Sequence, residues 1–178
     1  MQRHHHRLAG RGHRGPEPPG LGLCGNHRAR YRRRCVLPSA SERRRGLVTG
    51  SLDANVVLRL LLNDVPDQHA AAVSLLLTGG PFFVSDIAVI ETVFVLGRAY
   101  GLTRDQQRDS IHSLMILPQI VANVLLHDRA LSLYVAHPKL SFEDCCLVTA
   151  ADLTSHQPLW TFDRKLASQT DAQLLETA

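Results

Sequence analysis

The sequence has few aromatic residues, few cysteines and no long apolar run. Phe, Tyr and Trp make up 5% of the 178 residues, so the 44% hydrophobic content must build a core mainly from Leu, Val, Ile and Ala. No run approaches the roughly 18 apolar residues that a membrane-spanning helix needs. Two of the four cysteines, Cys145 and Cys146, are neighbours in an apolar helical pattern, which favours packing over a disulfide. We therefore expect a soluble protein, with no membrane segment, in the reducing cytoplasm.

Lysine is missing from residues 1–47, although arginine is abundant there. This segment holds 12 Arg, no Lys and two acidic residues, a net charge of +10. Residues 48–178 hold eight basic and 14 acidic residues, a net charge of −6. No apolar periodicity runs through the first segment, so it cannot bury enough surface to offset its ordering entropy. We predict a disordered basic segment rich in Arg, Gly and Pro at 1–47 and a folded domain at 48–178.

Two interpretations of the basic segment stay open. It is either an arm that holds nucleic acid through phosphate contacts, or it is not part of the natural protein. Arginine without lysine, with many Gly and Pro, is typical of GC-rich DNA translated upstream of a true start, and Val48 would then correspond to a GTG start codon. The mass of the protein from its native host distinguishes the two. Zinc is not expected, because the spacing of its potential ligands fits no finger pattern; these are His13, Cys24, His27 and Cys35.

From Gly50 onward, short apolar runs alternate with amphipathic patterns of helical period. This alternation predicts an α/β fold with a parallel sheet covered by helices on both faces. Asp86 is predicted to cap the helix that ends near Tyr100. The predicted strands are 48–53, 82–85, 120–125, 158–161 and 173–175, and the predicted helices are 55–63, 67–78, 86–100, 104–117, 128–136, 142–155 and 164–168.

Four acidic residues stand where a carboxylate is costly or where strands end. Asp53 and Asp163 each end a predicted strand, and parallel strands end at one edge of their sheet, which is where ligands bind. Glu91 has apolar neighbours three and four residues away on its helix, which predicts a carboxylate on the buried face. Asp144 is followed by Leu147 and Val148 at the same spacings, which again indicates the buried side.

Each acid taken singly has a structural interpretation. Asp53 or Asp163 can be a turn former or helix N-cap, and Glu91 can be half of a buried ion pair with Arg98 or Arg129. The four together favour another reading, because carboxylates in one cleft repel each other unless a cation lies between them. Ligands that offer only oxygen favour Mg²⁺ or Mn²⁺. Such ions activate water for phosphodiester hydrolysis.

Four segments of the chain resemble, in order and spacing, the motif blocks of PIN domains, specifically the VapC-like toxins of type II toxin–antitoxin systems. They are SLDANVVLRLLL, VSDIAVIETVFVL, LSFEDCCLVTAA and LWTFDRKLAS, and each contains one of the four acids. The resemblance runs from about Gly50 to the C-terminus. It implies a PIN-like three-layer α/β fold with a central parallel sheet flanked by helices. It also implies a Mg²⁺- or Mn²⁺-dependent endoribonuclease toxin that hydrolyses RNA.

The resemblance also implies roles for individual residues. Asp53, Glu91 and Asp144 would hold the metal, with Asp163 as a nearby ligand or a water-mediated partner. Asn55 would hold the Asp53 carboxylate by a hydrogen bond, and Thr161 would support the site beside Asp163. The implied partners are an RNA substrate, a second copy in a homodimer, and a cognate antitoxin protein whose tail covers the cleft.

Other functions remain to be distinguished from this one. A P-loop is absent, and Asn55 stands where a haloacid-dehalogenase-like phosphatase needs a second Asp. A non-catalytic PIN-like binding module and a DNA-directed nuclease of the same fold stay open. Arg164 and Lys165 adjoin Asp163 and are the preferred contacts for substrate phosphates, although solvated surface charge is the plain alternative. Trp160, Tyr100 and Tyr134 are predicted to belong to the core. The other cations of the domain considered for phosphate contacts are Arg59, Arg98, Arg104, Arg108 and Lys139.

Overall fold

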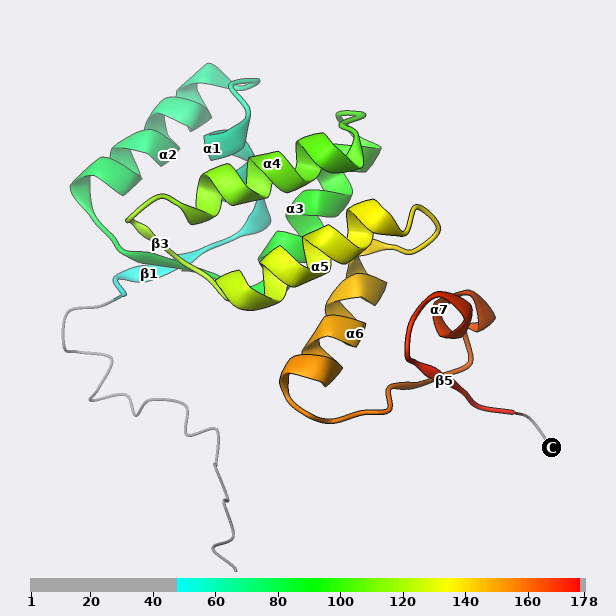
Figure 1. Cartoon of the computed structure of the whole chain (residues 1–178). Coiled ribbons are helices and arrows are strands. Elements are labelled where there is room, and N and C mark those ends of the chain that lie inside the picture. The colour runs from blue at the N-terminus through cyan, green and yellow to red at the C-terminus, as the bar shows by residue number, and fades with distance from the viewer. Residues whose placement is uncertain (1–47, 177–178) are drawn as a thin grey trace, which may run out of the picture. The chain divides into compact units, whose positions relative to one another are not determined.

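Three short strands form a parallel sheet in the first part of the folded chain (Figure 1). Strand β1 (Gly50–Leu52) pairs with β2 (Phe82–Val84), and β2 pairs with β3 (Ile120–Val121). Helices flank this sheet, which confirms the predicted α/β class. The computed structural model describes residues 48–176, so the expectation for residues 1–47 lies outside the described residues.

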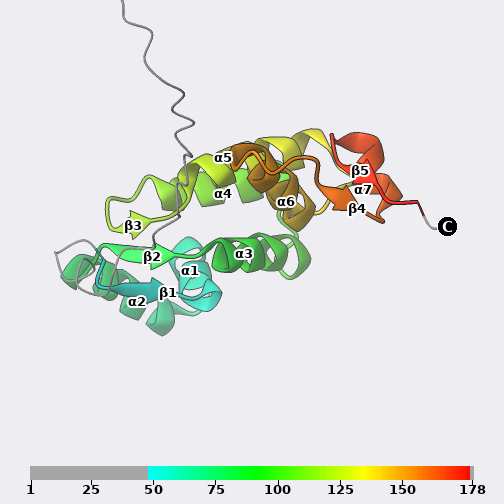
Figure 2. The same ribbon diagram turned by 90° about the horizontal axis from the view of Figure 1, so that it is seen from below.

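The last two strands form a separate sheet. Strand β4 (Trp160–Thr161) pairs in parallel with β5 (Gln173–Leu174), and neither pairs with β1. In Figure 2 these two strands lie beside the short helix α7, apart from β1, β2 and β3. The expectation that the strands before Asp53 and Asp163 end at one shared sheet edge is therefore wrong for this structure.

The helices agree closely with the amphipathic segments, because local capping residues set their ends. The cap of α3 and the start of α5 differ from the prediction, and α1 and α2 each begin one residue early. Ser85, not Asp86, caps α3, since its hydroxyl accepts a hydrogen bond from the Ala88 N–H. Helix α5 begins four residues early because Asn123 caps it through the Leu126 N–H. The helices are α1 (Ala54–Leu61), α2 (Pro66–Thr78), α3 (Asp86–Arg98), α4 (Arg104–Met115), α5 (Val124–Ala136), α6 (Phe142–Leu153) and α7 (Arg164–Gln169).

The core is aliphatic, as the composition requires. Cys145 and Cys146 are buried within it as free thiols, which confirms that they pack as small apolar residues. Trp160 and Tyr100 are exposed, so their assignment to the core is wrong. No helix within residues 48–176 is long and apolar enough to span a membrane. Side chains with almost no exposure include Val57, Val84, Val89, Leu96, Ile111, Leu114, Leu131 and Leu140.

Candidate functional site

Asp53 and Glu91 line one surface depression at the carboxyl end of β1. Asp53 directly follows β1 and caps α1, because its Oδ1 accepts a hydrogen bond of 2.8 Å from the Val56 N–H. Glu91 lies in the second turn of α3, which follows β2. The depression has a volume of about 350 Å³, and Ser51 and Ser85 also line it. The parallel pairing of β1 with β2 therefore brings these two predicted site residues together.

The Glu91 side chain is exposed, so the prediction of a buried carboxylate is wrong. It shares its helix face with Ile87 and Phe94, whose side chains are 77% and 66% exposed. Helix α3 carries apolar side chains on two opposite faces, and the face that is buried is the one without Glu91. The proposed buried pairs are also not formed in the described part of the chain. Arg129 instead pairs with Asp152 at 3.3 Å.

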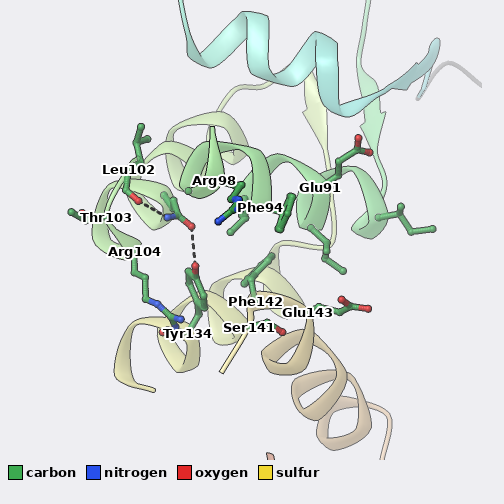
Figure 3. A pocket seen from close by; sticks show the side chains of 15 residues that line it. Glu91, Phe94, Arg98, Leu102, Thr103, Arg104, Tyr134, Ser141, Phe142 and Glu143 are labelled. Atoms are coloured by element: carbon green, nitrogen blue, oxygen red, sulfur yellow. Dashed lines mark hydrogen bonds between the residues drawn. The ribbon is translucent and has the colours of Figure 1, made fainter. Parts of the chain in front are cut away.

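Asp144 is held in the first turn of α6 by a capping box. Its Oδ2 accepts a hydrogen bond of 3.0 Å from the Ser141 N–H, and its own N–H donates to Ser141 Oγ at 3.0 Å. The Asp144 side chain is half-buried and Val148 packs against the core, but Leu147 is half exposed, so this helix face is only partly the buried side that we predicted. Ser141 and Glu143 line a larger cavity of about 670 Å³ that Glu91 also lines (Figure 3). The start of α6 therefore faces the exposed side of α3.

Asp163 follows β4 and caps α7. Its Oδ1 accepts hydrogen bonds from the N–H groups of Lys165 at 2.7 Å and Leu166 at 3.3 Å. Thr161 Oγ1 accepts from the Asp163 N–H at 2.9 Å, which holds the backbone just before the helix. Arg164 and Lys165 are exposed in the first helical turn. This turn directly follows β4, which pairs with β5 in the second sheet. Asp163 does not line the depression that Asp53 and Glu91 line.

The N-cap roles of Asp53 and Asp163 agree with their structural interpretation, but each cap occupies only one oxygen of the carboxylate. Asp53 and Asp163 each accept through Oδ1, and Asp144 accepts through Oδ2. The second oxygen of each has no hydrogen-bond partner within residues 48–176. A cap fixes the direction of a carboxylate while leaving one oxygen for another ligand, so capping and ligand binding are compatible.

The four acids do not form a complete metal site in this arrangement. Carboxylate oxygens are the donors that Mg²⁺ and Mn²⁺ prefer. Yet the described residues contain no group of three or more His, Cys, Asp or Glu close enough to hold one ion. Asp53 and Glu91 share a depression, whereas Asp144 and Asp163 lie outside it. The donor types fit a divalent metal, but the positions in one chain supply only half of the expected set.

The hydrogen bond that the resemblance implies from Asn55 to Asp53 is not formed in the described structure, so the supporting role of Asn55 stays a prediction. Asn55 is exposed in the first turn of α1. The Val56 N–H holds the carboxylate instead, because Asp53 occupies the N-cap position. Asn55 and Asp53 both line a second surface hollow, of about 450 Å³, between α1 and α2.

Arg104 is a structural residue and is not available to meet substrate. Its guanidinium donates to the backbone oxygens of Tyr134, His137, Pro138 and Leu140. Two further cations that we considered for phosphate contacts are also engaged in ion pairs. Arg59 pairs with Asp64, and Arg108 pairs with Asp105 and Asp109.

A buried histidine near the first sheet escaped the sequence reasoning. His127 is completely buried, and its Nε2 lies 3.0 Å from Asp86 Oδ1. Burial lowers the pKa of His127, and the nearby Asp86 carboxylate opposes that shift. The buried Ala130 and Leu131 at three and four positions along α5 were the signal that could have placed this residue in the core.

A comparison with known protein families matches most of the folded part of the chain. The sequence model of the family described as PIN domain matches residues 51–171. The match spans all four acids and also Asn55 and Thr161. A comparison with curated proteins finds no match to this chain.

Proposed function

The chain belongs to the PIN domain family, and from this premise we propose that it is a metal-dependent endoribonuclease, the toxin of a toxin–antitoxin pair. PIN domains are generally nucleases that often depend on divalent metal ions. The observation that carries the proposal is the placement of Asp53 and Glu91 around one depression at the end of β1. Carboxylates from a strand end and a neighbouring helix are the groups that such hydrolysis requires at a parallel sheet.

The metal of the proposal is Mg²⁺ or Mn²⁺, because the four candidate ligands offer only oxygen. The chain's own contribution is orientation. The caps of α1 and α7 and the capping box of α6 each tie one carboxylate oxygen to a backbone N–H and leave the other without a hydrogen-bond partner among the described residues. Ligands held in this way are more effective than freely rotating ones, because less entropy is lost when they bind.

RNA is the proposed substrate, and Arg164 and Lys165 are the proposed phosphate contacts. Residues 48–178 carry a net charge of −6, so their overall field does not attract a polyanion. Contact must then come from local cations. These two are exposed, immediately follow Asp163, and take part in no ion pair within the described residues. A cognate antitoxin and a second copy of the chain are the proposed protein partners.

The test is cleavage of total RNA by the purified protein with Mg²⁺, with Mn²⁺ and with EDTA. The informative variant is Asp53→Asn, because Asn caps a helix as well as Asp while removing the charge. We expect its cleavage to fall by more than about 100-fold. The matched control is Asp67→Asn, which changes an exposed acid in the first turn of α2 away from the depression.

The outcomes separate the alternatives. Discrete RNA fragments that need both metal and Asp53 support the proposal. Faster cleavage of DNA than of RNA would indicate a DNA-directed nuclease. A folded protein that binds no Mn²⁺ by calorimetry and cuts neither substrate would be a non-catalytic binding module.

A further inference from the structure

A cavity continues the depression at the end of β1 along the exposed side of α3 (Figure 3). Ile87 and Glu91 line both hollows, so the two meet at these residues. The cavity has a volume of about 670 Å³, within the range of about 300–1,000 Å³ that ligand sites commonly have. A strand whose phosphodiester bond lies at Glu91 therefore finds space for a neighbouring nucleotide beside it.

Aromatic side chains from three helices line this cavity. Phe94 of α3 is largely exposed, although an apolar side chain of this size gains from burial. Figure 3 shows Phe94 on the α3 side of the cavity and Tyr134 and Phe142 on the opposite side. The rings of Tyr134 and Phe142 pack edge to face with their centres 5.6 Å apart, so they support each other before any ligand enters. Aromatic rings that line a hollow are the groups on which nucleobases stack.

A free cation lies further along the same side of α3. Arg98 is exposed in the last turn of the helix, lines the cavity and forms no ion pair among the described residues. It stands seven residues after Glu91, which is about 10 Å along a helix axis. A stacked strand has one phosphate about every 3.4 Å. Arg98 can therefore meet a phosphate about three nucleotides from a bond held at Glu91.

The charges favour a polyanion over an apolar protein surface as the occupant. An apolar partner would desolvate Arg98 without pairing its charge, which is costly. A phosphate pairs well with a guanidinium, because the two groups match in geometry and charge. The apolar ring of Phe94 and the charge of Arg98 thus match the two parts of a nucleotide, a base and a phosphate.

We propose that this cavity is a subsite for one unpaired nucleotide of the substrate, in which Phe94 stacks on the base and Arg98 contacts the phosphate backbone. The identity of the ligand as substrate RNA rests on the proposed function. A base enters the cavity only when it is not paired, so the subsite restricts cleavage to single-stranded regions such as loops. A phenylalanine ring makes no hydrogen bond to a base edge, so the subsite accepts different bases.

Binding of RNA without cleavage tests the stacking. The full-length protein in EDTA is titrated into a fluorescein-labelled single-stranded RNA of about 12 nucleotides, and fluorescence anisotropy measures Kd. Phe94→Leu keeps an apolar side chain and removes the ring, so we expect a Kd about tenfold higher. Phe94→Trp keeps a ring and should bind as tightly as the wild type. The matched control Ile116→Ala removes an exposed apolar side chain at the end of α4, outside the cavity, and should not change Kd.

The salt dependence of binding tests Arg98. Removing one phosphate contact on a single strand lowers the slope of log Kd against log salt concentration by about 0.7. We expect this decrease for Arg98→Gln and no decrease for Phe94→Leu. The control Arg129→Gln removes another exposed arginine, which pairs with Asp152, and should leave the slope unchanged. A slope for Arg98→Gln equal to that of the wild type would overturn the phosphate contact.

Photochemical cross-linking locates the base directly. A single-stranded RNA that carries thiouridine is irradiated with the full-length protein in EDTA, and mass spectrometry identifies the linked peptide. We expect adducts on Phe94, Tyr134 or Phe142. Adducts confined to residues 1–47, or to the turn after Asp163, would overturn the subsite.

Three further outcomes separate the subsite from its alternatives. If Phe94→Leu converts a dimer into a monomer by light scattering and leaves Kd unchanged, this side of α3 is an interface between copies and the subsite is wrong. If the wild type cuts no RNA but its binding depends on Phe94 and Arg98, the nuclease proposal fails and the subsite stands. If Phe94→Leu cuts subsaturating RNA at the wild-type rate, the nuclease proposal stands and the subsite fails.

Discussion

Arg104 is expected to be the most important charged side chain for the stability of this domain. Its Nη1 donates to the backbone oxygens of Tyr134 and His137, and its Nη2 donates to those of Pro138 and Leu140 at 2.9 and 2.8 Å. The guanidinium carbon also lies 3.8 Å from the centre of the Tyr134 ring. The clamp thus satisfies the free carbonyls at the end of α5 and fixes the connection that leads into α6.

The magnitude follows from the surroundings of these bonds. Three of the four are part-buried, and losing a hydrogen bond there costs about 1 kcal/mol each, since water can partly replace the donor. The contact with the Tyr134 ring adds about 0.5 kcal/mol. Arg104→Ala should therefore lower the free energy of unfolding by about 3.5 kcal/mol. Arg104→Lys should lose roughly half of this, because an ammonium keeps the charge but cannot reach four carbonyls in a plane.

Urea unfolding followed by circular dichroism measures this loss. At a slope of about 1.5 kcal/mol per molar urea, the midpoint for Arg104→Ala should fall by roughly 2 M. The matched control is Arg108→Ala, one turn further along α4, whose ion pairs are exposed and contribute little. An Arg104→Ala midpoint that matches the control would refute the reasoning.

Three other predictions concern buried groups. Burial lowers the pKa of His127, so below pH of about 6.5 the unfolded chain binds a proton that the native chain does not. The contribution of His127 to the melting temperature should consequently be constant above that pH and fall below it. His127→Gln should make this fall with pH less steep. A variant whose melting temperature falls with pH as steeply as that of the wild type would contradict this. Gly97→Ala should lower the free energy of unfolding by about 1–2 kcal/mol, although Ala has the better helix propensity. The reason is that the Cβ of Ala would lie 2.9 Å from Nε2 of the buried Gln107. Thermal unfolding shows whether the variant is less or more stable than the wild type. Burial raises the pKa of Cys145 to about 11 and that of Cys146 to about 12. At pH 8, iodoacetamide should therefore modify these thiols only as the protein unfolds. Mass spectrometry measures the labelling, and rapid labelling of the folded protein would disprove the prediction.

The sequence by itself determined where helices and strands form, because their ends depend on local chemistry. Ser141 and Thr103 cap their helices through side-chain hydrogen bonds to residues three positions away. Gly101 and Pro118, residues that do not favour helix, stand three positions past the last residues of α3 and α4. The wrong cap of α3 and the wrong start of α5 are also local errors, because the sequence offers Ser85 and Asn123 as capping residues at these positions. The family was equally readable, because the order and spacing of its motif blocks are properties of the chain.

The tertiary structure alone decided which apolar face of α3 is buried. Ile87 and Phe94 on one face are as apolar as Val89 and Val93 on the other, so periodicity could not distinguish them. The choice depends on the helices that pack against α3, and these come from distant parts of the chain. For the same reason, Glu91 could be assigned to a helix but not to an exposed surface.

The tertiary structure also decided which acids meet. Asp53 and Glu91 share a depression because β1 pairs with β2, whereas Asp163 stays with β4 in a second sheet. Strand pairing joins residues that are far apart in the sequence, and no local pattern encodes it.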